Sequence, residues 1–70
     1  MSETFPARLR KLRERRGISR SVLGERCGLS KDIMRKYERG EREPTLDSLV
    51  KIADFFEVSM DYLSGRQNFL

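Results

Sequence analysis

Hydrophobic residues recur at three- and four-residue spacing along most of this chain, which is typical of amphipathic helices. Gly17, Gly28, Gly40 and Pro44 interrupt the pattern and divide it into short helices. No stretch of useful length alternates with the two-residue period of a strand. The pattern predicts an all-α fold with helices over about 5–16, 19–27, 30–39, 45–56 and 59–64.

Helix starts are marked by residues that suit them. Pro6 fits the first turn of a helix, where no backbone donor is needed. Four hydroxyl residues can cap the other helices: Ser19, Ser30, Thr45 and Ser59. Gly24 falls inside the second helix, where it either permits a close backbone approach or is a tolerated substitution.

The apolar positions of these helices define the expected core. They are Phe5, Leu9, Leu12, Val22, Leu23, Cys27, Ile33, Met34, Tyr37, Leu46, Leu49, Val50, Ile52, Ala53, Phe56, Met60 and Leu63. The basic residues around Leu9, including Arg8, are expected to surround this stripe at the surface.

The helix from Ser30 to Arg39 has the clearest division into two faces. At about 100° per residue, Ile33, Met34 and Tyr37 fall on one side. The opposite side is charged and carries Lys31, Asp32, Arg35, Lys36 and Arg39. Such a helix can pack on a small core and present its other face to a second molecule.

Charge is distributed unevenly along the 70 residues, whose net charge is +4. Residues 1–40 hold twelve Lys/Arg against five Asp/Glu, whereas residues 41–70 hold three against six. One cationic end and one mildly acidic end favour a polyanionic partner that binds on one side only. A solvated basic surface without such a partner is the alternative.

Several classes of protein are disfavoured by composition. The chain has no histidine, one cysteine and no glycine-rich phosphate loop, so we expect no enzyme, no metal site and no cofactor. Cys27 is interpreted as a small buried hydrophobe rather than a reactive thiol. The absence of a long apolar run and of a signal-like N-terminus predicts a cytoplasmic protein with no membrane segment.

Four segments of the chain form a recognisable set: RLRKLRERRGIS (8–19), LGERCGLSKDIMRKYERG (23–40), REPTLDSLVKIADFF (42–56) and VSMDYL (58–63). Together they resemble the lambda-repressor/Cro-type helix-turn-helix family, also called the xenobiotic-response-element family. The resemblance implies a compact five-helix domain over residues 5–65, and we expect flexible ends at 1–4 and 66–70. It also implies a transcriptional repressor that binds a palindromic operator as a homodimer, with its third helix in the major groove of double-stranded DNA.

Base contacts are expected from the first turns of that helix, because its N-terminal residues reach base edges. The candidates are Lys31, Asp32, Arg35 and Lys36. Lysine and arginine donate to guanine O6 and N7. Asp32 either accepts from cytosine N4 or serves only as a helix-dipole partner, and Lys36 contacts either a base or the backbone.

Phosphate contacts are expected at two helix starts and from three long cationic arms. The candidates are Ser19, Arg20, Ser30, Arg39 and Arg42. In the family a glutamine that bridges a phosphate and the recognition helix commonly stands at the position of Arg20. Arginine is a departure from this pattern. It should strengthen nonspecific contact, and whether it also forms the bridge stays open. Glu41 is a second departure, because a basic or small residue is frequent in the family after the glycine of the YERG motif.

Two further expectations concern structure and assembly. Arg13 and Glu38 match a pair that the family joins by a salt bridge; two unpaired surface charges are the alternative. Apolar residues left over after the core is filled are candidates for a dimer surface or are scattered surface residues. They are Phe55, Tyr62, Phe69 and Leu70.

Two functions other than DNA-binding regulation are compatible with this sequence. An antitoxin or protein-interaction adaptor built on the same fold is the main alternative, although the basic face of the third helix favours DNA. RNA binding is a weaker choice, because most aromatic residues are assigned to the core. We expect a nucleoid-associated cytoplasmic regulator with no small-molecule ligand.

Overall fold

The computed structural model describes residues 4–66, which form five helices and no strand. The helices are α1 (Phe5–Arg16), α2 (Arg20–Cys27), α3 (Lys31–Glu38), α4 (Leu46–Phe56) and α5 (Met60–Leu63). The all-α prediction and its five helices are therefore confirmed. Predictions for residues 1–3 and 67–70, including Phe69 and Leu70, lie outside the described residues.

Local chemistry explains where these helices begin and end. Four of the five described helices start at a hydroxyl side chain that accepts a hydrogen bond from a backbone N–H three residues on. These caps are the predicted residues Ser19, Ser30, Thr45 and Ser59. Gly28 ends α2 with φ 70°, a left-handed conformation that lets the chain turn sharply into α3.

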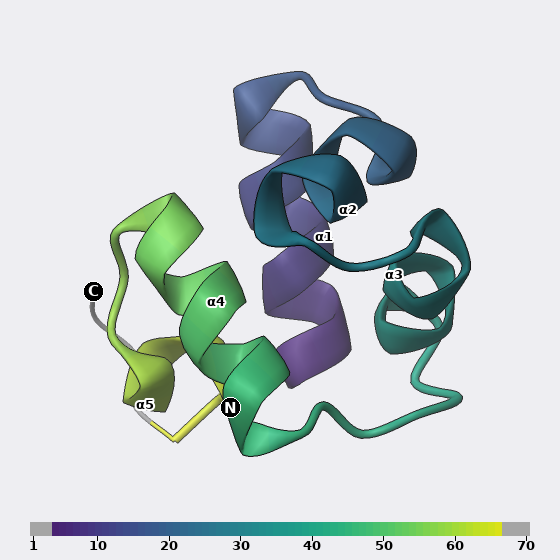
Figure 1. The fold of residues 1–70 in the computed structure, drawn as a ribbon. Coiled ribbons are helices and arrows are strands. Elements are labelled where there is room, and N and C mark those ends of the chain that lie inside the picture. The colour runs from purple at the N-terminus through teal and green to yellow at the C-terminus, as the bar shows by residue number, and fades with distance from the viewer. Residues whose placement is uncertain (1–3, 67–70) are drawn as a thin grey trace.

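The helices surround a single core (Figure 1). α1 runs through the middle and contacts α3 on one side and α5 on the other, while α2 contacts both α3 and α4. Each helix contributes one large side chain with 0% exposure. These are Leu9, Leu23, Met34, Ile52 and Leu63. Burying each such side chain is worth about 1.5–3 kcal/mol, so all five helices depend on one another.

Gly24 permits the close approach that the sequence left open. A Cβ atom at this position would lie 2.7 Å from the carbonyl oxygen of Leu29 and 3.1 Å from the carbonyl carbon of Ser30. Both are backbone atoms, which cannot rotate away as a side chain would. The absence of a side chain at Gly24 therefore lets the turn before α3 lie directly on α2.

The extent of the predicted core is wrong at four positions. Leu46 is 70% exposed, and Val22, Val50 and Met60 are 36–40% exposed. Short helices on a small core bury a limited stripe, and these residues lie beside it rather than on it.

Arg8 is the opposite error, since it was expected at the surface and is 3% exposed. It lies three residues after Phe5 and four before Leu12, on the buried stripe of α1. Its Nη1 atom donates to the carbonyl oxygen of Tyr62 at 2.7 Å, and its guanidinium lies 4.3 Å from the centre of the Tyr62 ring. Arg8 thus fastens α5 to α1.

Candidate nucleic-acid interface

The structure places the four predicted base-contacting side chains together on the outer face of α3. The inner face of this helix is buried through Met34 and Tyr37, with Ile33 packed beside them. Lys31 and Asp32 are exposed, and Arg35 and Lys36 are half-exposed one turn further along. α3 is therefore held from below while its first two turns remain accessible.

Asp32 organises the charges on this face. Its Oδ1 lies 2.5 Å from Arg35 Nη2, and its Oδ2 lies 3.4 Å from Lys36 Nζ. We call Asp32, Arg35 and Lys36 the outer cluster. The hydrogen bond from Arg35 is the main reason that the pKa of Asp32 falls below its ordinary value, and the same bond raises the pKa of Arg35. The three- and four-residue spacings of these pairs on one helix are the sequence signal from which the pairing could have been predicted.

A second cluster lies on the other side of α3. Glu38, whose side chain is 1% exposed, accepts two hydrogen bonds from Arg13, Nε–Oε2 at 2.6 Å and Nη2–Oε1 at 3.0 Å. Arg20 Nε donates to the same Oε1 at 3.1 Å. We call Arg13, Arg20 and Glu38 the inner cluster. It joins α1, α2 and α3, and the hydrogen bonds that Arg13 donates to Glu38 are the main reason that the pKa of Arg13 is raised.

The inner cluster decides two points that the sequence left open. Arg13 and Glu38 are paired rather than being separate surface charges. Arg20 is partly engaged within the protein, since its Nε faces Glu38, while its side chain keeps 36% exposure. The pairing of Arg20 with Glu38 was missed because the two residues are 18 positions apart and no local pattern connects them.

The remaining candidates for phosphate contact differ in whether their side chains already have a partner within the described residues. The hydroxyls of Ser19 and Ser30 accept from their own helices, which leaves each hydroxyl proton free to donate. Arg39 pairs with Glu41 at 2.8 Å. Lys31 and Arg42 are exposed and form no ion pair within residues 4–66.

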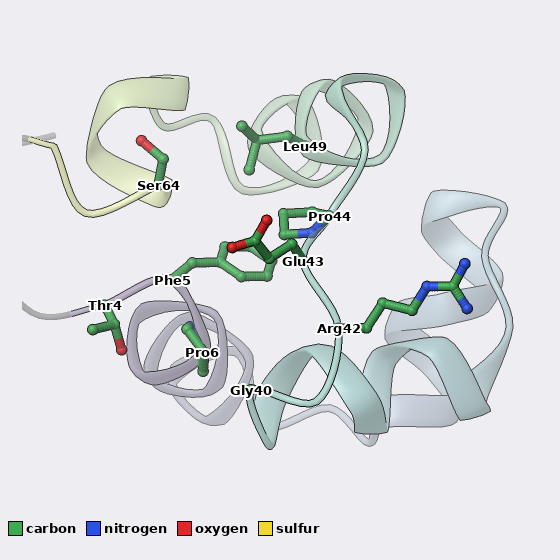
Figure 2. A pocket seen from close by; sticks show the side chains of 9 residues that line it. All are labelled: Thr4, Phe5, Pro6, Gly40, Arg42, Glu43, Pro44, Leu49 and Ser64. Atoms are coloured by element: carbon green, nitrogen blue, oxygen red, sulfur yellow. The ribbon is translucent and has the colours of Figure 1, made fainter.

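A hollow of about 450 Å³ lies beside the loop that carries Arg42 (Figure 2). Its walls come from the start of α1, the loop after α3, α4 and the residue that follows α5. Phe5, Pro44 and Leu49 give it an apolar interior, whereas the guanidinium of Arg42 points away from it. Arg42 therefore lines the rim but is directed outward.

Two of the suspected dimer residues are not left over after the core is filled. Phe55 and Tyr62 are half-buried and pack against the core. Phe55 meets the ring of Phe56 edge-on at 5.0 Å, with the guanidinium of Arg16 5.1 Å from its centre. The premise that Phe55 and Tyr62 are left over from the core is therefore wrong, whereas their place in a dimer surface stays a prediction.

Residues 4–66 contain no group of three His, Cys, Asp or Glu side chains placed to hold a metal ion. None of their helices combines the length and the apolar character needed to cross a bilayer.

The sequence profile of the helix-turn-helix family matches residues 9–63. The chain belongs to the helix-turn-helix family. This confirms the resemblance to lambda-repressor/Cro-type proteins. Among curated relatives, the transcriptional repressor RstR of the cryptic phage CTXphi from Vibrio cholerae is 42% identical over 55 residues, covering 76% of this chain and 49% of RstR. The HTH-type transcriptional regulator ImmR of Bacillus subtilis is 32% identical over 59 residues, covering 84% of this chain and 46% of ImmR.

Solved structures of other helix-turn-helix domains show the same fold. The P22 c2 repressor in complex with synthetic operator 9T matches with a TM-score of 0.88 and 27% identity, over 94% of this chain and all of that one. The restriction-modification controller protein C.AhdI of Aeromonas hydrophila matches with a TM-score of 0.79 and 32% identity, over 84% of this chain and 89% of that one. The chain spans about half the length of the curated relatives named here.

Proposed function

We propose that this domain is a sequence-specific regulator of transcription, a repressor that inserts α3 into the major groove of double-stranded DNA. The observation that carries the proposal is the exposed charged face of α3, supported from below by fully buried Met34 and by Tyr37. The major groove, about 12 Å wide, admits one α-helix, and the N-terminal residues of such a helix reach base edges.

Each side chain of the proposed interface has a role that its chemistry suits. Lys31, Asp32, Arg35 and Lys36 meet the base edges. Ser19 and Ser30 offer hydroxyl protons to phosphates, and Arg20, Arg39 and Arg42 offer charge. Residues 1–40, which hold twelve Lys/Arg against five Asp/Glu, supply α1 to α3.

The comparisons support this proposal. RstR is named as a transcriptional repressor, and the P22 c2 repressor was solved bound to a synthetic operator. The family and its named relatives are regulators rather than enzymes, in agreement with the expectation of no enzyme. They do not favour the rival interpretation as an antitoxin or adaptor.

We further propose that the domain acts on DNA as a homodimer. Two copies related by a twofold axis would place their α3 helices about 34 Å apart, one turn of the duplex, and would bind a palindromic operator. A regulator of this kind acts in the cytoplasm, at the nucleoid. Phe55 and Tyr62, covered by arginines, now support a dimer surface less well than the sequence suggested.

Selection of bound sequences from a pool of random duplexes, using the full chain, tests the proposed function. Enrichment of a palindromic motif with half-sites one turn apart is the expected result. A pool that stays random after repeated rounds at low salt would contradict it.

Substitution of the reading face gives the matching test on the protein. Lys31→Ala or Arg35→Ala should weaken binding to the selected duplex by about 5- to 150-fold and relax the preference at one base position, because a bidentate or direct base contact is lost. The control is Lys51→Ala, which removes an exposed charge from α4. Equal losses on selected and scrambled duplexes would show that Lys31 and Arg35 read no base.

A further inference from the structure

The outer cluster raises a question that the proposed function leaves open, namely which of its members reads DNA. Both oxygens of the Asp32 carboxylate already face a cation, Oδ1 toward Arg35 and Oδ2 toward Lys36. A cytosine amino group would have to compete with these two charged donors for the carboxylate, which favours a positioning role for Asp32 over direct reading.

From this geometry, and resting on the proposed function, we infer that Asp32 is a positioning residue that holds Arg35 for a guanine in each half-site. Arg35 reads the base, and Asp32 determines where the guanidinium of Arg35 lies. Guanine is thus the base that Arg35 reads, and the two charged residues have different roles.

The pairing determines the direction in which Arg35 reaches. Asp32 lies three residues earlier, so the bond at Nη2 draws the guanidinium back toward the start of α3. That end of a recognition helix is the part that meets base edges. Without Asp32, a long arginine side chain on this face is free to swing to the nearest phosphate, which carries no sequence information.

The guanidinium keeps enough donors for a base while it is held. It has five N–H groups, and the bond to Asp32 uses one of them. The others can meet the paired acceptors O6 and N7, which guanine alone presents in the major groove. Adenine places an amino donor beside N7 instead, so a fork that only donates rejects it.

The charge of Asp32 adds a second effect in the same direction. A carboxylate on the DNA-facing side of α3 repels phosphates, and it reduces the three positive charges of Lys31, Arg35 and Lys36 on that face to a net of two. Binding to arbitrary DNA depends chiefly on such charge. Asp32 therefore weakens nonspecific binding while it orders the side chain that supports specific binding.

α4 offers a closely matched control. Asp47 is the second residue of its helix after the Thr45 cap, as Asp32 is the second residue after the Ser30 cap. Asp47 Oδ2 pairs with Lys51 Nζ four residues on at 3.0 Å, just as Asp32 pairs with Lys36. Asp47→Asn thus removes the same charge from the same kind of helix position, away from α3.

The test compares Asp32→Asn with Asp47→Asn on the selected duplex and on a scrambled duplex of equal length. Asp32→Asn should tighten scrambled-duplex binding several-fold and lower the preference for guanine over adenine at one position per half-site by about tenfold. Asp47→Asn should leave that preference unchanged. An unchanged preference in Asp32→Asn overturns the inference.

A double substitution shows whether Asp32 acts through Arg35. In the Arg35→Ala background the guanine preference is already lost, so adding Asp32→Asn should lower it no further. A further loss would mean that Asp32 acts on DNA by itself. The motif selected by Asp32→Asn gives a further check. If it lacks a cytosine that the wild-type motif contains but keeps the guanine, Asp32 itself reads a base and the inference is overturned.

Failure of this inference can be told apart from failure of the proposed function. If the wild-type chain enriches no motif, the proposed function fails. If it enriches a motif that Asp32→Asn reads equally well, the proposed function stands and only the positioning role of Asp32 fails.

Discussion

The inner and outer clusters of α3 have the same charges and opposite surroundings. Each consists of one carboxylate between two cations. In the inner cluster the Glu38 side chain is 1% exposed, and its partners come from α1 and α2. In the outer cluster the Asp32 side chain is 58% exposed, and both partners lie on α3 itself.

The two clusters have equal charges, so the difference between them lies in the exposure of the carboxylate and in whether its partners come from other helices. These two properties determine whether a cluster stabilises the fold. A buried carboxylate that loses its partners is left without solvation, so the inner cluster ties the fold together. An exposed pair on one helix is screened by water and adds little to folding. The outer cluster is therefore accessible to another molecule, which can meet the donors of Arg35 that Asp32 does not use.

Removing the carboxylate of the inner cluster should have the largest effect on stability. Glu38→Ala leaves the charges of Arg13 and Arg20 facing each other without compensation, and we expect the free energy of unfolding to fall by about 3–5 kcal/mol. Urea denaturation measures it. Glu25→Ala, an exposed carboxylate on α2, is the control, and a loss from Glu38→Ala no greater than in that control would contradict the structural role.

Arg20 pairs with Glu38 and also belongs to the proposed interface, so its substitution should affect both stability and DNA binding. Arg20→Ala should cost about 1 kcal/mol of stability, because Arg13 still pairs with Glu38 and Arg20 is partly solvated. It should also weaken binding to all duplexes alike and make the negative slope of log K against log salt shallower by about 0.9.

Arg42→Ala should weaken DNA binding without changing stability. Arg42 is exposed and forms no ion pair within the described residues, so its loss should change the salt slope and leave the urea midpoint unchanged. A salt slope that neither variant alters would show that these arginines do not contact phosphates.

The smallest effect should be the pH dependence of stability that comes from Asp32. Because Arg35 lowers the pKa of Asp32 in the folded state, the pair stabilises the fold fully above the ordinary carboxyl pKa, about 3.9. This stabilisation is lost as the pH falls through the lower folded-state pKa. Unfolding of wild type and Asp32→Asn should therefore differ slightly at pH 6 and converge near pH 2, and a gap that widens with acid would contradict this sign.

Local features of this molecule could be predicted from the sequence, and features that depend on distant contacts could not. Ser19 and Ser30 were identified as caps because a cap and its helix are adjacent in the chain. Arg8 was misplaced because its partner Tyr62 lies 54 residues away. Leu46 shows the limit of hydrophobic pattern, since an apolar residue at a helix start need not reach the core.

The candidate site divides in the same way. Periodicity was enough to place Lys31, Asp32, Arg35 and Lys36 on one face of α3. The pairing of Asp32 with Arg35 is also local, and its three-residue spacing was available in the sequence. The engagement of Arg20 by Glu38 required the packing of α2 against α3, which no single segment encodes.

Mapping of backbone amide shifts by NMR, during titration with a selected duplex, tests most directly whether the outer face of α3 is the surface that reads DNA. The account predicts the largest changes at residues 30–36, smaller ones near Ser19 and Arg42, and little change at Leu46 and Val50 on the exposed side of α4. Large changes around Leu46, Val50 and Met60 with an unperturbed α3 would contradict it.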